Sequence, residues 1–491
     1  MKLIEEIIAT AKANSETLAF VEADRSFTYR ELFDAVSQLT ETIQSRQLTE
    51  RPILVFGAND FRTLAAMLAA SLSGHAYIPV DAHTPLPRLE MILSVAKPSL
   101  IIATAALSAD YDSLLTDRID FLDFEAAAAF DFEQLDTTSA ISGDDTDYII
   151  FTSGTTGTPK GVAVSHDNLA SFTHWMNKDF EQIEKNQFLE QALYSFDLSI
   201  FSIYPCLTQG GTLQSLSHDE TTNFKHLFER LNRTKLSTWI STPSFVDICL
   251  MDPSFTEAQH PDLKQFIFCG EELTHKTAEK LLAAFPNAAV YNTYGPTEAT
   301  GAVTSIKITA EVLEKYSRLP LGQAKPGVDI ELMDNEIIIS GDSVAKGYFE
   351  NSEKTAAAFF EKDGQSAYHT GDAGFFDDSG ILNYKGRIDF QVKYNGFRIE
   401  LQDIEANLLS LPEVKQAVVL ARENEQHKVT GLIAFLSVTE EAPDRVFTKA
   451  LKQELSPLIM DYMMPTKFIY LDSFPLNHNE KIDRKALMEM L

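Results

Sequence analysis

The stretch FTSGTTGTPKGV, from Phe151 to Val162, decides how the rest of the chain is interpreted. The apolar run DYIIF leads into it, which predicts a strand ending in a loop rich in glycine and hydroxyl side chains. Glycines let backbone N–H groups approach an anion, hydroxyls add donors and a lysine adds positive charge. The GxxxxGK[ST] spacing of a Walker loop is absent. We therefore predict a phosphate-binding loop of another kind, rather than a flexible Ser/Gly turn, formed by Thr152, Ser153, Gly154, Thr155, Thr156 and Lys160.

Outward from this loop, short β-branched runs alternate with longer helical patterns as far as about residue 385. One apolar helix is flanked by two predicted strands, PILVFGAND and AYIPVDAHTP. The same alternation of strands and helices continues through STWISTPSF, DLKQFIFCGEEL and AAVYNTYGPTEAT. Such alternation predicts βαβ crossovers and mainly parallel sheets that helices cover on both faces. Sites in these sheets form at loops after the carboxyl ends of strands. We expect a large α/β domain over residues 1–388, with a small β subdomain.

After Gly386 the pattern changes. AVVLAREN and KVTGLIAFLSV predict a β-hairpin, FTKALKQELSPLI predicts a helix, and KFIYLDSFPL predicts a last strand. We expect a separate α+β domain over residues 389–491.

Composition narrows the possible partners. The 491 residues carry a formal net charge of −30, which disfavours binding to nucleic acid or to anionic lipid. Three cysteines, Cys206, Cys249 and Cys269, without a CxxC pair, indicate a reduced compartment. Leu3, Ile4, Ile7, Ile8 and Ala11 share one helical face and predict a helix, not a signal peptide. The apolar stretch 63–80 is too interrupted to insert in a membrane, so we expect a cytoplasmic protein.

Four further motifs follow the loop in order: YGPTEAT from Tyr294, YHTGD from Tyr368, GRIDFQVKYNGFRIEL from Gly386 and NEKIDRKAL from Asn479. Together the five motifs resemble those of the acyl-adenylate-forming superfamily, which includes acyl-CoA synthetases, luciferases and peptide-synthetase adenylation domains. The resemblance spans about residues 147–487. It implies the acetyl-CoA synthetase-like adenylating fold, with ATP and Mg²⁺ as cofactors.

The resemblance also assigns nucleotide contacts. Tyr294 would stack on adenine, Asp372 would accept hydrogen bonds from both ribose hydroxyls, and Arg387 would contact the ribose. Glu298 would hold the magnesium ion bound by ATP, as a hard cation prefers carboxylate and phosphate oxygens. His369 stands where the family commonly has arginine, and we expect a polar surface residue there. The remaining nucleotide contacts would be Asn292, Thr293, Gly295, Pro296, Thr297, Tyr384, Lys385 and Gly386.

Lys481 matches the catalytic lysine of the superfamily. Negative charge builds up as an acyl carboxylate attacks the α-phosphate, and an ammonium group there would stabilise it. The lysine would also contact ATP and the acyl substrate. The usual Asn–Gly–Lys reads Asn479–Glu480–Lys481 here, so a carboxylate replaces a glycine.

The acyl group is expected to be a small amino acid. Asp197, in SFDLS, resembles the aspartate that pairs with the substrate ammonium in amino-acid-adenylating members; a helix N-cap is the structural alternative. YSFDLSIFSIYPCL, FCGEEL and NTYGPTEATGAVTS most resemble members that activate D-alanine for teichoic-acid D-alanylation. Cys269 matches a pocket cysteine of those members, with a plain buried cysteine as the alternative. Gly301 stands where they carry valine, which is expected to enlarge the pocket.

The second half of the reaction would transfer the acyl group to the phosphopantetheine thiol of a small D-alanyl carrier protein. The family rotates its C-terminal domain about a hinge, which matches Asp389. Residues 394–397, with Gly396, would then face the thiol, and Lys385, Lys393 and Arg398 would contribute to a basic docking face.

Three alternatives stay open at this point. The first is another amino-acid-adenylating enzyme, the second is an acyl- or aryl-CoA synthetase, and the third is a nucleotide-binding module without catalytic activity. Asp197 argues against the second and Lys481 against the third.

Overall fold

The computed structural model describes residues 2–116, 118–120, 132, 135–154, 158–425, 427–440, 442–476 and 482–490. These residues divide into two compact units. The first holds residues 1–82, 95–151 and 161–386, and the second holds residues 83–94, 152–160 and 387–491. The expected domain boundary after residue 388 stays a prediction.

The larger sheet of the first unit has nine strands in the order β15-β14-β13-β12-β11-β9-β10-β1-β2. Its central strands, from β13 to β1, pair in parallel, and the strands at both edges pair antiparallel. Parallel neighbours need crossover connections, as the alternating sequence pattern predicts. The strands are β1 Leu18–Glu22, β2 Arg25–Thr28, β9 Gln187–Glu190, β10 Thr212–Ser215, β11 Thr238–Ser241, β12 Gln265–Phe268, β13 Ala289–Tyr294, β14 Thr304–Lys307 and β15 Gln323–Ala324.

A second sheet has seven strands in the order β18-β8-β7-β4-β3-β5-β6. Strands β3, β4, β5, β6 and β7 pair in parallel, and β18 closes one edge antiparallel to β8. The strands are β3 Ile53–Gly57, β4 Tyr77–Asp81, β5 Leu100–Ala103, β6 Arg118–Asp120, β7 Thr146–Thr152, β8 Lys160–Ser165 and β18 Gly347–Tyr348.

The expected small β subdomain is a five-stranded sheet. It runs β16-β17-β20-β19, with β21 paired to β20, and strands β16, β17, β20 and β19 pair antiparallel in that order. The strands are β16 Val328–Met333, β17 Glu336–Gly341, β19 Phe359–Lys362, β20 Gln365–Phe376 and β21 Leu382–Arg387.

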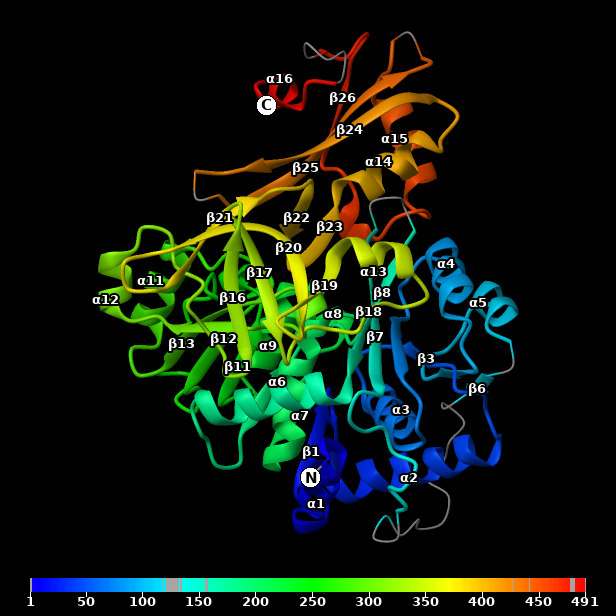
Figure 1. Cartoon of the computed structure of the whole chain (residues 1–491), viewed down its shortest axis with the longest axis vertical. Coiled ribbons are helices and arrows are strands. Elements are labelled where there is room, and N and C mark those ends of the chain that lie inside the picture. The colour runs from blue at the N-terminus through cyan, green and yellow to red at the C-terminus, as the bar shows by residue number, and fades with distance from the viewer. Residues whose placement is uncertain are drawn as a thin grey trace. The chain divides into compact units, whose positions relative to one another are not determined.

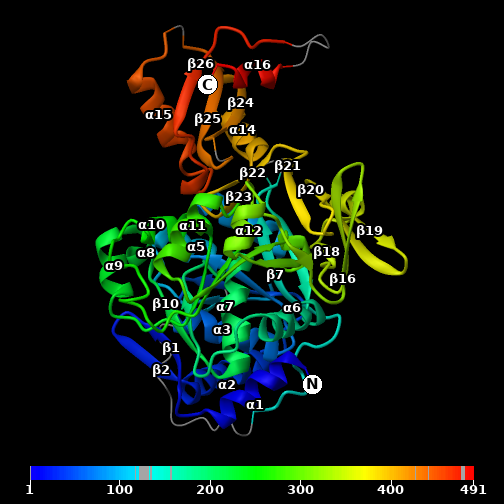
Figure 2. The same ribbon diagram turned by 90° about the vertical axis from the view of Figure 1, so that its left-hand side faces the viewer.

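Helices cover the sheets of the first unit (Figures 1 and 2). The expected face of α1 is buried in full, and the stretch 63–80 forms most of α3 followed by β4. The helices of this unit are α1 Leu3–Ala13, α2 Tyr29–Ser45, α3 Phe61–Leu72, α5 Ala109–Leu114, α6 His166–Asp179, η3 Asp197–Ser199, α7 Ile200–Gln209, α8 His218–Thr222, α9 Phe224–Leu231, α10 Pro243–Cys249, α11 His275–Ala284, η4 Thr297–Ala299, α12 Ala310–Lys315 and α13 Ser352–Ala358. Helix α4 Leu86–Ala96 belongs mainly to the second unit.

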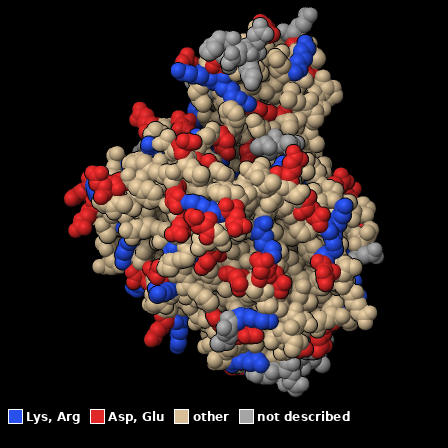
Figure 3. All heavy atoms as spheres, in the orientation of Figure 1, with Lys and Arg blue, Asp and Glu red and all other residues tan. Residues whose placement is uncertain are grey.

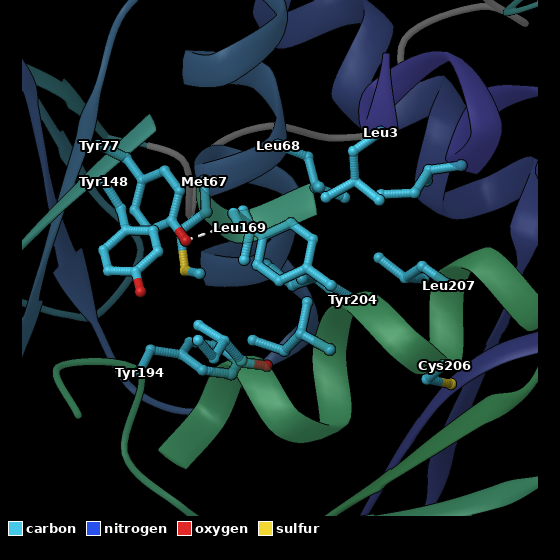
Figure 4. Close-up of a cluster of buried hydrophobic side chains, with 14 of the residues drawn as sticks. Leu3, Met67, Leu68, Tyr77, Tyr148, Leu169, Tyr194, Tyr204, Cys206 and Leu207 are labelled. Carbon is cyan, nitrogen blue, oxygen red and sulfur yellow. Dashed lines mark hydrogen bonds between the residues drawn. The ribbon is translucent and has the colours of Figure 1, made fainter. Parts of the chain in front are cut away.

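A cluster of buried side chains lies between these layers (Figure 4). Tyr77 and Tyr204 share a hydrogen bond of 2.8 Å between their hydroxyls, and the rings of Tyr77 and Tyr148 lie 5.9 Å apart. Cys206, Cys249, Trp175 and Trp239 are all buried, as expected of core residues. The core therefore contains aromatic rings with polar ends as well as aliphatic side chains.

The C-terminal part has the expected hairpin, helix and last strand. Strand β24 pairs antiparallel with β25, and β26 pairs parallel with β25. Helices α14 and α15 pack on one face of this sheet and α16 on the other. The elements are β22 Gln391–Tyr394, β23 Phe397–Glu400, α14 Leu401–Leu409, β24 Val414–Glu423, β25 Val429–Val438, α15 Arg445–Leu455, η5 Asp461–Met463, β26 Lys467–Tyr470 and α16 Arg484–Met488.

Carboxylates are spread over the face in Figure 3, with lysine and arginine between them. In the part of the chain that the structure describes, no helix has the length and apolar character to cross a membrane. The cytoplasmic location stays a prediction.

A buried histidine–aspartate hydrogen bond connects the N-terminal helix to other elements of the first unit. Asp147 Oδ2 lies 2.7 Å from His166 Nδ1, and Ser71 Oγ donates to Asp147 Oδ1 at 2.8 Å. The backbone N–H of Leu3 donates to His166 Nε2 at 3.1 Å. Burial alone would lower the pKa of His166, but the hydrogen bond and charge of Asp147 more than offset it and raise the pKa. One carboxylate thus connects β7, α3, α6 and the start of α1.

We predict that Asp147→Ala destabilises the protein by about 3–5 kcal/mol, because it leaves two buried groups without their acceptor. Denaturant unfolding measures the loss. The control Asp378→Ala removes an exposed carboxylate and is expected to change stability by less than about 0.5 kcal/mol. Equal stability of the two variants would contradict the assignment.

Candidate active site

The glycine- and hydroxyl-rich loop connects β7 to β8, as the sequence predicts. Thr152 ends β7, Lys160 begins β8, and Thr152 Oγ1 donates to the Lys160 carbonyl at 3.4 Å. Ser153 and Gly154 are described and lie between them, whereas Thr155, Thr156 and Gly157 lie outside the described residues. The phosphate-binding role of this loop stays a prediction.

Within the second unit, this loop already has partners. Ser153 Oγ donates to the Arg398 carbonyl at 3.2 Å and accepts from the Glu400 N–H at 3.1 Å. Lys160 Nζ lies 3.9 Å from Glu400 Oε1. A phosphate group that used Lys160 would therefore compete with a carboxylate for the same ammonium.

In the first unit, three of the expected nucleotide residues meet. Tyr294, at the end of β13, donates its hydroxyl to Asp372 Oδ2 at 2.6 Å. Tyr384, on β21, donates to Asp372 Oδ1 at 3.3 Å. Burial, and then the charge of Asp372, raises the pKa of Tyr294 well above its usual value, so the phenol stays protonated and donates. Each carboxylate oxygen has a second lone pair, which is what an acceptor for two ribose hydroxyls needs.

The turn after Tyr294 is buried, although a Gly–Pro pair is typical of exposed turns. Tyr294 is only 4% exposed, and Gly295 and Pro296 are also buried. The reason is close backbone packing: a Cβ on Gly295 would lie 2.6 Å from the Cα of Ala302. The turn folds back on residues 301–302, which only glycine permits at this position.

The neighbouring residues are held by their own hydrogen bonds. Asn292 Nδ2 donates to the Pro320 carbonyl at 2.8 Å, and Thr293 Oγ1 donates to the Phe268 carbonyl at 2.8 Å. Thr297 begins the short helix η4, which carries Glu298. These side chains fix β13 and its following turn.

Glu298 is fully buried, which excludes a solvated surface glutamate. Tyr348, at the end of β18, donates its hydroxyl to Glu298 Oε1 at 2.8 Å. The Ala345 N–H donates to the Glu298 carbonyl at 2.9 Å. The described residues contain no group of three or more His, Cys, Asp or Glu side chains suited to a metal. The expected role of Glu298 in holding magnesium stays a prediction.

The other expected nucleotide residues lie at the end of β21. Lys385 Nζ lies 5.0 Å from the centre of the Phe375 ring, and Gly386 has a φ of 127°. Arg387 Nε donates to Asp389 Oδ1 at 2.8 Å, and Arg387 Nη2 forms a second contact with Asp389 Oδ2. Burial would raise the pKa of Asp389, but its hydrogen bond and charge pair with Arg387 lower it. Arg387, the expected ribose contact, is thus hydrogen-bonded directly to Asp389, the expected hinge residue.

The substrate residues gather around α7. Asp197 is the first residue of η3 and leads into α7, so Phe196 rather than Asp197 occupies the capping position. Cys269 is buried, and its Sγ lies 3.5 Å from the Gly301 carbonyl. Gly301 has a φ of 79°, and a Cβ there would lie 2.8 Å from Cε2 of Phe201. Phe201 therefore lies directly beside Gly301, and the expected enlargement of the pocket stays a prediction.

Lys481 lies outside the described residues. His369 is partly exposed and contacts Glu336 at 3.0 Å through Nδ1, as expected of a surface residue. Lys393 and Arg398 face each other across the β22–β23 pair, and the Asn395–Gly396 turn between them has a φ of 51° and then 87°. This turn is a tight two-residue hairpin turn that favours Asn–Gly.

Two site residues have no signal in the sequence. Tyr348 contacts Glu298 from 50 residues away in the chain. Arg318 holds Glu272 through two hydrogen bonds, of 2.9 and 2.6 Å, and its guanidinium lies 5.0 Å from the centre of the Tyr384 ring. Both belong to segments outside the five motifs, so only the folded chain brings them to the site.

Comparison with known families agrees with this geometry. Residues 8–349 match the AMP-binding enzyme family, and residues 403–481 match the AMP-binding enzyme C-terminal domain. The chain belongs to the AMP-binding enzyme family, also called the acyl-adenylate-forming superfamily.

Relatives match over their full length. A protein of Lactococcus lactis subsp. lactis named D-alanine–D-alanyl carrier protein ligase is 64% identical, across 100% of this chain and 99% of the relative. A protein of Lactiplantibacillus plantarum with the same name is 43% identical, across 99% of both chains.

Solved structures share the fold. The Vibrio cholerae adenylation domain AlmE, in complex with glycyl-adenosine-5'-phosphate, is 23% identical with a TM-score of 0.85 over 99% of this chain and 97% of that one. The amide bond synthetase McbA of Marinactinospora thermotolerans is 18% identical with a TM-score of 0.87 over the whole of both chains. The expected adenylating fold is confirmed.

We predict that Tyr348→Phe lowers stability by about 1–3 kcal/mol, because the buried Glu298 carboxylate loses a hydroxyl donor. Chemical denaturation without nucleotide isolates this effect. The control Tyr316→Phe removes a tyrosine hydroxyl from Asp377 at a more solvent-exposed position, where water can replace it, and a smaller loss is expected. A loss in Tyr348→Phe no larger than in the control would count against the contact.

Proposed function

We propose that the protein is a D-alanine–D-alanyl carrier protein ligase that forms AMP. It would activate D-alanine as D-alanyl-adenylate and transfer the acyl group to the phosphopantetheine thiol of a carrier protein that serves (lipo)teichoic acid D-alanylation. The observation that carries the proposal is the 64% identity with a protein of that name over essentially the whole of both chains. The contacts around Asp372, Glu298 and Gly301 are consistent with it.

In the first half-reaction, the carboxylate of D-alanine would attack the α-phosphorus of ATP, and pyrophosphate would leave. Asp372 would hold the ribose, with Tyr294 and Tyr384 fixing the carboxylate in place. Lys160 and the hydroxyls of its loop would bind the phosphates. Lys481 would bring its ammonium to the reacting carboxylate and phosphate, where negative charge increases.

A magnesium ion would neutralise phosphate oxygens at Glu298 when ATP is bound. Tyr348 would orient the Glu298 carboxylate through its hydrogen bond, because the glutamate lies in a buried environment that fixes its rotamer.

The substrate pocket would suit a small amino acid. Asp197 would pair with the ammonium group at the start of α7. Phe201 occupies the space next to Gly301, and the Cys269 thiol contacts the Gly301 backbone, so the walls are close-packed. A close-packed wall disfavours an extra methylene by about 1–3 kcal/mol.

In the second half-reaction, the phosphopantetheine thiolate would attack the acyl carbon and AMP would leave. The first step needs Lys481 at the phosphate and the second needs the thiol at the acyl carbon, so the C-terminal domain would rotate about Asp389 between the two steps. The Arg387–Asp389 pair lies at that hinge, and ribose binding to Arg387 would alter it.

ATP–pyrophosphate exchange across a panel of amino acids tests the substrate. We expect the highest kcat/KM with D-alanine and at least tenfold less with an amino acid one methylene larger, as about 1.4 kcal/mol gives a factor of ten. Preference for another amino acid would favour a different adenylating enzyme, and exchange with fatty or aromatic acids alone would favour a CoA synthetase.

Asp197→Ala tests the ammonium contact. We expect the KM for D-alanine to rise by about two orders of magnitude, since loss of a buried charge pair costs about 2–5 kcal/mol. The KM for ATP should change little. The control Asp262→Ala removes an exposed carboxylate and should leave both KM values unchanged. An unchanged D-alanine KM in Asp197→Ala would remove this contact from the proposal.

Lys481→Ala tests the catalytic lysine. We expect adenylate formation to fall by about 10²–10³-fold in kcat, a typical loss for one group that stabilises transition-state charge. Single-turnover release of pyrophosphate measures this step separately from thiol transfer. The control Lys485→Ala removes an exposed ammonium four residues away and should retain activity. Full adenylation by Lys481→Ala would refute the assignment.

A further inference from the structure

A group of polar residues lies where neighbouring parallel strands end, next to the expected substrate site. Glu190 ends β9, Ser215 ends β10 and Glu22 ends β1, and these three strands are adjacent in the nine-stranded sheet. Asn59 follows β3 of the seven-stranded sheet. The carboxyl ends of parallel strands are where α/β proteins place their sites.

Glu190 is fully buried and has two hydrogen-bond partners. Ser215 Oγ lies 3.1 Å from Glu190 Oε2, and Asn59 Nδ2 lies 3.4 Å from Glu190 Oε1. Ser215 Oγ also lies 3.0 Å from the backbone carbonyl of Asn59. A serine hydroxyl has one proton, so it cannot donate fully to both acceptors. A protonated Glu190 supplies the missing donor, because it donates to Ser215 while Ser215 donates to Asn59.

The surroundings also favour the neutral acid, because burial disfavours the charged form of Glu190. Two carboxylates lie nearby: Asp60 precedes α3, and Glu22 accepts a hydrogen bond from the Phe61 N–H at 3.0 Å and forms an ion pair with Arg25. Arg62 is the cation that acts on Asp60. The buried Tyr194 hydroxyl, which has no hydrogen-bond partner among the described residues, lies in the field of Glu190, Asp60 and Glu22. Burial raises the pKa of Glu190 to about 8.

Asn59 connects this acid to the loop that precedes Asp197. Its Nδ2 also donates to the Ala192 carbonyl at 2.6 Å, and its Oδ1 accepts from the Tyr194 N–H at 3.1 Å. The amide of Asn59 therefore holds the loop at two backbone groups. Tyr194 anchors the same loop in the buried cluster (Figure 4), and Asp197 follows three residues later.

We propose that Glu190 is a positioning residue for amino-acid binding: its neutral carboxyl group completes a hydrogen-bond chain through Ser215 and Asn59 that fixes the loop leading to Asp197. This inference rests on the proposed function, since it takes Asp197 as the partner of the substrate ammonium. Ionisation removes the proton donated to Ser215 and leaves a negative charge at a fully buried position. The loop then loses its fixed position, and the amino acid binds less tightly.

The sign of the pH effect follows from the raised pKa. Glu190 stays neutral in the folded protein up to about pH 8, whereas it ionises near its ordinary value of 4.5 in the unfolded chain. Below pH 4.5 Glu190 is neutral in both states and does not reduce the free energy of unfolding. Between pH 4.5 and about 8 only the unfolded chain ionises, so the free energy of unfolding falls as the pH rises. Glu190→Gln does not titrate, and its amide can donate to Ser215 in the same way.

The test compares the wild type with Glu190→Gln between pH 6.5 and 9 by amino-acid-dependent ATP–pyrophosphate exchange. We expect nearly equal KM values for D-alanine near pH 7 and a wild-type KM about tenfold higher than that of the variant at pH 9, since the neutral fraction of Glu190 falls about tenfold per pH unit above 8. Titration of the substrate itself cancels in this ratio. The ratio of the wild-type KM for ATP to that of the variant should stay the same at every pH.

Two further variants separate positioning from a general structural role. Glu190→Ala removes the chain at all pH values and should raise the D-alanine KM even at pH 7. Glu184→Gln makes the same chemical change at an exposed position and should follow the wild type throughout. A KM ratio between wild type and Glu190→Gln that stays flat from pH 6.5 to 9 would overturn the proposal.

An error in the proposed substrate can be distinguished from an error in the role of Glu190. If D-alanine supports no exchange in the wild type, the amino acid that does support it replaces D-alanine in the comparison. Thermal unfolding without substrate tests the neutral carboxyl directly: the wild type should lose stability relative to Glu190→Gln between about pH 4.5 and 8. A pH-independent difference would overturn the proposal whatever the substrate.

Discussion

The hydrogen bonds from Tyr294 and Tyr384 to the Asp372 carboxylate connect the parts of the first unit that form its site. Tyr294 ends a strand of the nine-stranded sheet, whereas Asp372 and Tyr384 belong to the five-stranded sheet. A carboxylate that is 2% exposed is stable only if its lone pairs are satisfied, and the two phenols meet part of that requirement. The position of the expected ribose acceptor therefore depends on how two separate sheets pack.

The same arrangement occurs at other buried acids of this unit. Glu298 accepts from the Tyr348 hydroxyl, and Asp147 accepts from the Ser71 hydroxyl. A hydroxyl satisfies a buried oxygen without the long side chain and the desolvation cost of a lysine or an arginine. In a chain with a net charge of −30, such contacts let carboxylates remain inside without an equal number of buried cations.

The sequence predicts the fold well where residues close in the chain determine it. Alternating β-branched and helical segments give the parallel sheets, the face of α1 gives its burial, and the Asn395–Gly396 turn follows from local preference. Contacts between distant segments are not predictable in this way. No pattern relates Tyr348 to Glu298, and the close approach of Gly295 to Ala302 is equally hidden in the sequence. The space beside Gly301 depends on Phe201, one hundred residues earlier, so the effect of this glycine on the pocket does not follow from the sequence.

A crystal structure with a non-hydrolysable ATP analogue and magnesium is the most direct measurement of this account. It predicts that the O2' and O3' atoms of the ribose lie within hydrogen-bond distance of the Asp372 carboxylate, and that the triphosphate lies against residues 152–160. A nucleotide bound elsewhere, with Asp372 bonded only to its two tyrosines, would contradict the account.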